Sequence, residues 1–210
     1  MIVTHFGAEA FKVQLGDTVI AFNPISKDSK LKPARFGADV VLSSLPHVDT
    51  NGSEQMEFGE KKPFVIAGPG EYEVQGIFIK GFGSESMYGG EKLYNTVYFL
   101  TLDGIKMCFL GALGKPELPN EALESAEEID MLFVPIGGDG VLTASEAGKL
   151  AVSLEPKLII PMHWSGIGSK DALKTFLKEV GKDVKEEDKL TVKKKDLEGK
   201  VGEVCVLSAQ

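Results

Sequence analysis

The hydrophobic period of the chain changes part-way along its length, and this change limits the fold more than any other feature. Up to residue 117, short β-branched and aromatic runs are separated by glycine and proline turns, as is typical of β-strands. Beyond residue 117, apolar residues at helical spacing alternate with continuous apolar runs of strand length. A chain with many strands first and alternating helices and strands afterwards is predicted to pack two sheets together with helices outside.

Strand patterns occur repeatedly in the first part. They cover residues 2–4, 11–15, 18–22, 40–43, 64–67, 94–102 and 105–110. The last two flank Asp103-Gly104, a dipeptide that tolerates positive φ at both central positions of a type I′ turn. We therefore expect a β-hairpin over residues 94–110.

Two helices and two buried strands are predicted in the second part. The first helix begins after Thr143, which forms a capping box with Glu146, and ends before Pro156. The second helix begins near Ser169, and Gly181 is its expected C′ residue. Continuous apolar runs, typical of strands covered on both faces, occupy residues 130–135 and 157–161.

Composition narrows the classes of function. Of the 210 residues, 43% are hydrophobic, enough for one sizeable core, and we expect a single domain over residues 1–210. The 23 basic and 31 acidic residues give a formal net charge of -8 without a basic stripe, so no nucleic-acid partner is expected.

No apolar run approaches the roughly 18 to 20 residues that span a bilayer, and the first residues resemble a strand rather than a signal peptide. We therefore expect no membrane partner and a cytoplasmic location.

Cysteine and histidine are scarce, which restricts the chemistry further. Cys108 and Cys205 lie in apolar stretches, as expected of buried reduced thiols rather than of a disulfide. The chain has only three histidines, His5, His47 and His163, so a metal site rich in imidazole is excluded by number.

Two of these histidines follow predicted strands. The strand at 40–43 runs into a loop with His47 and Asp49, in the kind of place where ligands and catalysts commonly lie. The alternative is a surface loop in which Asp49 bonds its own backbone and His47 is incidental. The strand at 157–161 leads into His163, which suits a metal ligand or a general base. A histidine at the core rim that bonds a backbone carbonyl is the alternative there.

Two glycine-rich segments could bind an anion through their backbone amides, and they occupy residues 137–140 and 166–169. The first lacks the Gly-Lys-Ser or Gly-Lys-Thr of a phosphate-binding loop, which favours a flexible turn. For the second, a simple loop that caps the following helix is the alternative.

The order of these segments resembles the metallo-β-lactamase fold hydrolases. Residues 44–50, Ser-Leu-Pro-His-Val-Asp-Thr, align in frame with the family's loop Thr-His-x-His-x-Asp-His. Residues 135–138 match a Pro-x-Gly-Gly segment before a helix, and residues 161–163 match a closing Pro-x-His. Over residues 1 to 170 the chain resembles the branch of small cytoplasmic metal-dependent hydrolases that includes ascorbate-phosphate lactonases. The resemblance implies an α/β fold, a four-layer αββα sandwich of the metallo-β-lactamase type.

The resemblance also implies a metal site from which this sequence departs. In the family, one zinc ion is bound by the first two histidines of the loop and by a third histidine from a later strand. The second zinc ion is bound by the loop aspartate, the histidine after it and the closing histidine, and another aspartate bridges the two metal ions. Leu45, Thr50 and Ala112 stand in place of two histidines and the bridging aspartate, and no histidine occurs near residues 83–85. His47, Asp49 and His163 are the ligands that remain.

Near the N-terminus the chain departs from this branch as well. The branch usually has Gly-His and Asp-Pro there, whereas this sequence has Gly7-Ala8 and Asn23-Pro24.

These departures lead to three hypotheses about function. The first is a catalytically silent or altered member without a cofactor, which binds a small molecule or a protein partner. The second is a mononuclear hydrolase of an ester, lactone or phosphoester, with one zinc ion on His47, Asp49 and His163 and with Asp49 and His163 as catalytic residues. The third is a small-molecule or anion sensor whose ligand occupies the pocket that holds the metal ions in the family. All three predict that these side chains converge at one end of the sandwich, beside Leu45 and Ala112.

Overall fold

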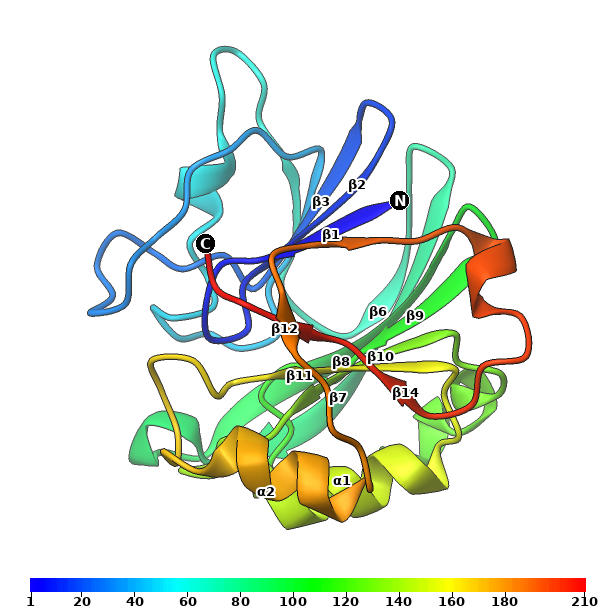
Figure 1. The fold of residues 1–210 in the computed structure, drawn as a ribbon. Coiled ribbons are helices and arrows are strands. Elements are labelled where there is room, and N and C mark those ends of the chain that lie inside the picture. Colours follow the sequence, from blue (N-terminus) through cyan, green and yellow to red (C-terminus); the bar gives the residue numbers. More distant parts are fainter.

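Two β-sheets pack face to face in the computed structural model, which describes all 210 residues, and both α-helices lie outside one of the sheets (Figure 1). The first sheet has the order β13-β1-β2-β3-β4-β5. Its strands are β1 (Ile2–His5), β2 (Phe11–Leu15), β3 (Thr18–Phe22), β4 (Val40–Leu42), β5 (Phe64–Ile66) and β13 (Leu190–Thr191).

The second sheet has seven strands in the order β14-β11-β10-β9-β8-β7-β6. They are β6 (Gly70–Val74), β7 (Ile77–Ser86), β8 (Leu93–Leu102), β9 (Ile105–Phe109), β10 (Met131–Pro135), β11 (Leu158–Met162) and β14 (Glu203–Val204). A separate parallel pair joins β12 (Glu186–Glu187) to β15 (Val206–Leu207). The helices are α1 (Ala144–Ser153) and α2 (Ala172–Glu179), with 3-10 turns η1 (Ser53–Met56), η2 (Tyr88–Gly90), η3 (Asn120–Ala122), η4 (Glu124–Ala126) and η5 (Lys194–Leu197).

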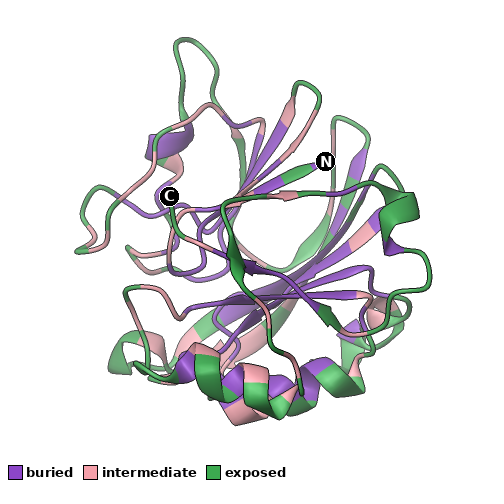
Figure 2. Ribbon diagram, in the orientation of Figure 1, coloured by how far each residue is buried: buried purple, intermediate pink, exposed green.

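The main core lies between the two sheets, and alternate residues of several strands contribute to it. Figure 2 shows the buried residues along these strands. Aromatic rings from both sheets meet there, since Phe22 of the first sheet contacts Phe109 and Phe133 of the second. A second core lies between the seven-stranded sheet and the two helices, which turn their buried sides toward it. Outside the six-stranded sheet, η1 and the segment before β4 take the place of an α-helix, and Met56 and Ala38 pack there against Val41. The predicted sandwich of two sheets with helices outside is confirmed.

The strongest local predictions are also confirmed. Strands β8 and β9 form the expected hairpin, and Asp103 and Gly104 both have positive φ, 52° and 70°. Thr143 and Glu146 form the capping box at the start of α1. The two continuous apolar runs are β10 and β11, which are buried along their whole length and pair in parallel. Both cysteines are free and buried.

The structure differs from the expectations in several places. Helix α2 begins at Ala172 and not near Ser169, because the Ser169 amide donates to the Gly137 carbonyl (2.8 Å) and holds the chain in a loop. Strand β7 has no clear strand pattern because it contains two glycines. One of them, Gly81, is required by packing, since a Cβ there would lie 2.9 Å from Thr96 Cγ2.

The short strands near the C-terminus were not predicted either. They have two residues each and form by pairing with distant segments, so their own sequence carries little signal. Strand β13 pairs antiparallel with β1, placing Thr191 opposite Ile2. The Met1 amino group donates to the Val192 carbonyl (3.0 Å) at the same edge. Neither α1 nor α2 has the length and apolar composition required of a membrane-spanning helix.

The run Lys193–Lys195 is exposed, and Lys194 has a buried partner that the sequence did not indicate. Its amine and that of Lys157 donate to the buried Asp130 carboxylate at 2.5 and 2.8 Å, and the Lys106 amide donates to it at 2.7 Å. Burial alone would raise the pKa of Asp130, but these hydrogen bonds outweigh it and the pKa is lowered. Asp130 therefore joins the start of β10 to β11 and to η5.

We expect Asp130→Asn to lower the free energy of unfolding at pH 7 by about 1 to 3 kcal/mol, because the amide replaces a charged acceptor of three hydrogen bonds. A lowered folded-state pKa stabilises the fold above the unfolded aspartate pKa, and this stability disappears as pH falls through the folded value. Urea unfolding from pH 7 to pH 3 should therefore show the difference between variant and wild type shrinking toward acid. Asp17→Asn, at an exposed turn, is the matched control and should change little at any pH.

Candidate functional site

The loop with His47 and Asp49 follows β4 and is fixed by Thr50. The Thr50 hydroxyl donates to the Leu45 carbonyl (2.7 Å), and the Thr50 amide donates to the His47 carbonyl (2.9 Å). These bonds close a tight turn around residues 47–50. Thr50 is buried and therefore has a structural role where the resemblance implies a ligand.

His163 follows β11 and is held by the turn after β1. Its amide donates to the Ala8 carbonyl (2.8 Å), and its Nδ1 lies 2.7 Å from Glu9 Oε1, with both side chains almost fully buried. Because the carboxylate is an acceptor, Nδ1 carries the shared proton and Nε2 is the free nitrogen. Nε2 is the one buried side-chain nitrogen or oxygen without a hydrogen-bond partner.

Glu9 links His163 to the ends of two more strands. Its second oxygen accepts from Asn23 Nδ2 (2.6 Å), and the same Asn23 side chain bonds both the hydroxyl (2.8 Å) and the amide (2.7 Å) of Ser44. This network, His163–Glu9–Asn23–Ser44, is entirely buried. Glu9 was missed from the sequence, where the available signal was a lone carboxylate in the apolar run 8–11.

Three residues in or next to this network have strained backbone conformations. Ala8, Asn23 and His163 all have left-handed φ values, of 49°, 41° and 61°. Such conformations cost energy for residues other than glycine and are concentrated at functional sites. In Figure 1, the turn after β1, the long loop after β3 and the loop after β11 lie together on the left of the molecule.

One further side chain, Tyr88 of η2, contacts all three predicted site residues. Its ring lies 4.9 Å from the His47 ring and 4.9 Å from the His163 ring, edge to face in both cases. The two imidazoles are therefore within twice that distance of each other. The Tyr88 hydroxyl donates to Asp49 Oδ2 (2.5 Å), and the Ser29 hydroxyl donates to Asp49 Oδ1. Burial, with the Asp49 carboxylate beside it, raises the pKa of Tyr88.

Apolar side chains complete the site. Leu45, Ala112 and Val141 form a small buried cluster, and Tyr88 packs against it. The Ala112 amide donates to Asn95 Oδ1 (2.8 Å), which fixes the backbone at this position. The predicted convergence of His47, Asp49 and His163 beside Leu45 and Ala112 is what the structure shows, whereas their roles stay predictions.

His5 lies outside the site and belongs to the core. Its Nδ1 lies 2.9 Å from the Leu207 carbonyl and its ring stacks on Phe11, 4.6 Å between centroids. Burial lowers the pKa of His5.

A family model described as a β-lactamase superfamily domain matches residues 2–163. A protein from Thermotoga maritima, provisionally described as a Zn-dependent hydrolase of the metallo-β-lactamase superfamily, is 30% identical, with a TM-score of 0.74 over 100% of this chain and 99% of its own. The chain belongs to the metallo-β-lactamase superfamily.

Two further proteins resemble this chain at lower identity. A protein of Bacillus licheniformis named UPF0173 metal-dependent hydrolase is 25% identical over 197 residues, which cover 79% of this chain and 86% of the relative. Igni18, a metallo hydrolase from Ignicoccus hospitalis, covers 99% of this chain and 95% of its own with a TM-score of 0.63, and at 19% identity this likeness shows the fold alone.

The donor set present does not fit the metal pair of the superfamily as it is arranged. Both Asp49 oxygens accept hydroxyl hydrogens, and the Tyr88 ring lies against both imidazoles. No group of three or more His, Cys, Asp or Glu side chains is placed to hold a metal ion. Catalytic zinc needs three protein ligands and an open position for water.

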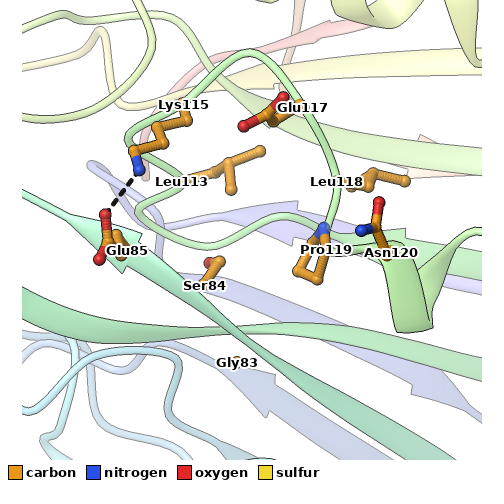
Figure 3. A pocket seen from close by; sticks show the side chains of 9 residues that line it. All are labelled: Gly83, Ser84, Glu85, Leu113, Lys115, Glu117, Leu118, Pro119 and Asn120. Atoms are coloured by element: carbon orange, nitrogen blue, oxygen red, sulfur yellow. Dashed lines mark ion pairs between the residues drawn. The ribbon is translucent and has the colours of Figure 1, made fainter.

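A separate cavity of about 300 Å³ lies between β7 and the loop after β9 (Figure 3). Lys115 reaches from the loop to Glu85 on the strand (2.7 Å), and Lys92 contacts the same carboxylate. The hydrogen bonds from Lys115 and Lys92 lower the pKa of Glu85 to about 2. The lining of this cavity includes none of the predicted site residues, and the charges of Glu85 and Lys115 offset each other.

Proposed function

We propose that this chain is a member of the superfamily that has exchanged metal-dependent hydrolysis for binding of a small molecule or a protein partner. The observation that carries the proposal is the packing of Leu45 and Ala112. Both are fully buried and touch Val141 at the positions where the resemblance implies a histidine and the bridging aspartate. Neither side chain can coordinate a metal, so this part of the site resembles an ordinary core.

The donors that remain support the same proposal. By the resemblance, the first metal position keeps only His47, and the second keeps Asp49 and His163. A hydrolytic zinc site needs about three protein ligands to lower the pKa of its water to roughly 7. The Thr50 hydroxyl and the Ala112 amide make hydrogen bonds that hold the loops in place. This indicates that the replaced positions now have structural roles.

We expect purified wild-type protein to show no zinc-dependent rise in melting temperature and no loss of stability on chelation. A metal that binds only the folded state would add roughly 2.7 kcal/mol at a hundredfold excess over Kd, which a thermal melt resolves easily. Elemental analysis and melts with zinc and with a chelator test the proposal. Stoichiometric zinc, or a melting temperature several degrees higher with zinc, would overturn it.

One observation favours a second candidate, the mononuclear hydrolase. His163 Nε2 is buried and free, and a free imidazole nitrogen near a second histidine and a carboxylate is a suitable donor. If this candidate is right, zinc-dependent hydrolysis of an ester, lactone or phosphoester should disappear in His163→Ala. The same variant should lose any zinc-dependent stability.

A further inference from the structure

Another cavity, of about 320 Å³, lies between the turn after β1, the long loop after β3, the loop after β11 and the last residues of the chain. These segments meet on the left of Figure 1. The last residues are held there because the Gln210 amide donates to the His5 carbonyl (3.1 Å). The cavity is lined by no side chain of the candidate functional site. The two are adjacent, however, since Ala8 lines the cavity and its carbonyl accepts from the His163 amide (2.8 Å).

Much of the cavity lining is apolar. Ala8 and Ile25, which are buried, line it together with the partly buried Phe6 and Leu31. The Phe6 ring stacks on Phe36 with 5.2 Å between ring centroids, which fixes this side of the cavity. Small-molecule sites are mostly apolar and have a few polar groups that fix the orientation of the ligand. The lining therefore favours a ligand with an apolar body.

The charge of the cavity comes from one lysine. Lys32 is the only ionisable side chain in the lining, it is exposed, and its amine forms no ion pair. The same loop carries Lys27, Lys30 and Arg35, so residues 27–35 have four basic side chains and one acidic one in a chain whose net charge is -8. A local excess of one charge attracts ligands of the opposite charge. The loop therefore favours an anionic ligand.

Neutral donors in the lining match the same kind of ligand. The amides of Gly7, Ala8, Ser165 and Gly166 donate to no other group of the chain. Three of these residues have positive φ, with 94° at Gly7, 49° at Ala8 and 80° at Gly166. Backbone amides in turns can form concavities that bind anions. The lining thus has donors without acceptors in addition to the free cation.

We propose that this cavity binds a small monocarboxylate with an apolar body, with the carboxylate on Lys32 and the apolar part over Phe6 and Ile25. One unpaired amine matches one negative charge, and hydrogen bonds between ionised groups are the stronger ones. A phosphate monoester carries nearly two negative charges and would leave one of them without a cation. The inference goes beyond the proposed function, since it assigns a ligand class and a place outside His47, Asp49 and His163 and holds whether or not a metal ion binds there.

Calorimetric titration of the full chain with hexanoate and with benzoate tests the proposal. Hexanoate should bind at one site, and hexanamide, which has the same apolar body without the charge, should bind about tenfold more weakly. Lys32→Gln should weaken hexanoate binding about tenfold and leave hexanamide binding unchanged. Lys30→Gln is the matched control, because Lys30 is an exposed lysine of the same loop outside the lining, and it should change neither affinity.

A second variant tests the apolar part of the cavity. Leu31→Ala should weaken the binding of hexanoate and hexanamide by the same factor, about fivefold, because both lose the same apolar contact. Leu123→Ala, at an exposed leucine outside the lining, should leave both unchanged.

Three results would overturn the proposal. They are the failure of folded wild-type protein to bind either hexanoate or benzoate, hexanoate binding that Lys32→Gln does not weaken, and competition by inorganic phosphate as strong as that by hexanoate. None of them bears on the proposed function, which fails separately if wild-type protein binds stoichiometric zinc.

Discussion

Glu9→Leu is expected to lower the free energy of unfolding by about 2 to 6 kcal/mol, because two buried hydrogen-bond donors would each lose their acceptor at about 1 to 3 kcal/mol. Glu9 is 1% exposed and accepts hydrogen bonds from His163 and Asn23 at 2.7 and 2.6 Å. Leucine has a similar volume but no acceptor, so two buried donors would lose their partner. Urea unfolding at pH 7 measures the change.

Two controls separate this network from a general effect of replacing a glutamate. Glu9→Gln keeps one acceptor oxygen and should cost less than Glu9→Leu. Glu73→Leu, on the exposed side of β6, should change stability by no more than about 0.5 kcal/mol. If Glu9→Leu unfolds at the same urea concentration as wild type, the network does not stabilise the fold.

Restoring the ligands should reverse the response to zinc. In the triple variant Leu45→His, Thr50→His and Ala112→Asp, the new polar groups are buried without partners when no metal is present. We expect a loss of about 1 to 3 kcal/mol for each unsatisfied group, and zinc should recover much of it. Thermal melts with zinc and with a chelator provide the measurement.

The matched control for the triple variant carries Ala112→Asn in place of Ala112→Asp. It has nearly the same shape but lacks the carboxylate, so it should be destabilised similarly and recover less with zinc. A triple variant that zinc does not stabilise would show that the positions taken from the resemblance do not meet in space. In the same background, Tyr88→Ala should increase the zinc response, because the Tyr88 ring lies against both imidazoles.

The elements predicted correctly from the sequence are those whose signal is local. The hairpin turn at Asp103-Gly104 needs only two residues that accept positive φ, and α1 begins where Thr143 and Glu146 can bond each other. Strand β7 was missed because its two glycines weaken the strand pattern. The short C-terminal strands were missed because their partners lie elsewhere in the chain. Pairing with β1 is what makes β13 a strand.

The same distinction between local and tertiary signals applies to the site residues. His47, Asp49 and His163 could be found because each follows a strand and the order of their segments resembles a known family. Glu9 and Tyr88 could not, since neither has a recognisable motif and both reach the site by tertiary packing. Tyr88 precedes two glycines in a turn, a pattern that indicates a loop and gives no information about where the side chain points.

The pairing of β1 with β13 also affects how the chain folds. The Met1 amino group and the Val192 carbonyl are 191 positions apart, yet they meet at one sheet edge. Contacts of such long range must close a large loop before they contribute stability, and they slow folding. During synthesis, β1 leaves the ribosome long before its outer partner exists. We therefore infer that the first sheet keeps an open edge until residues 190 and 191 have been synthesised, and that this edge is exposed to mispairing in the nascent chain.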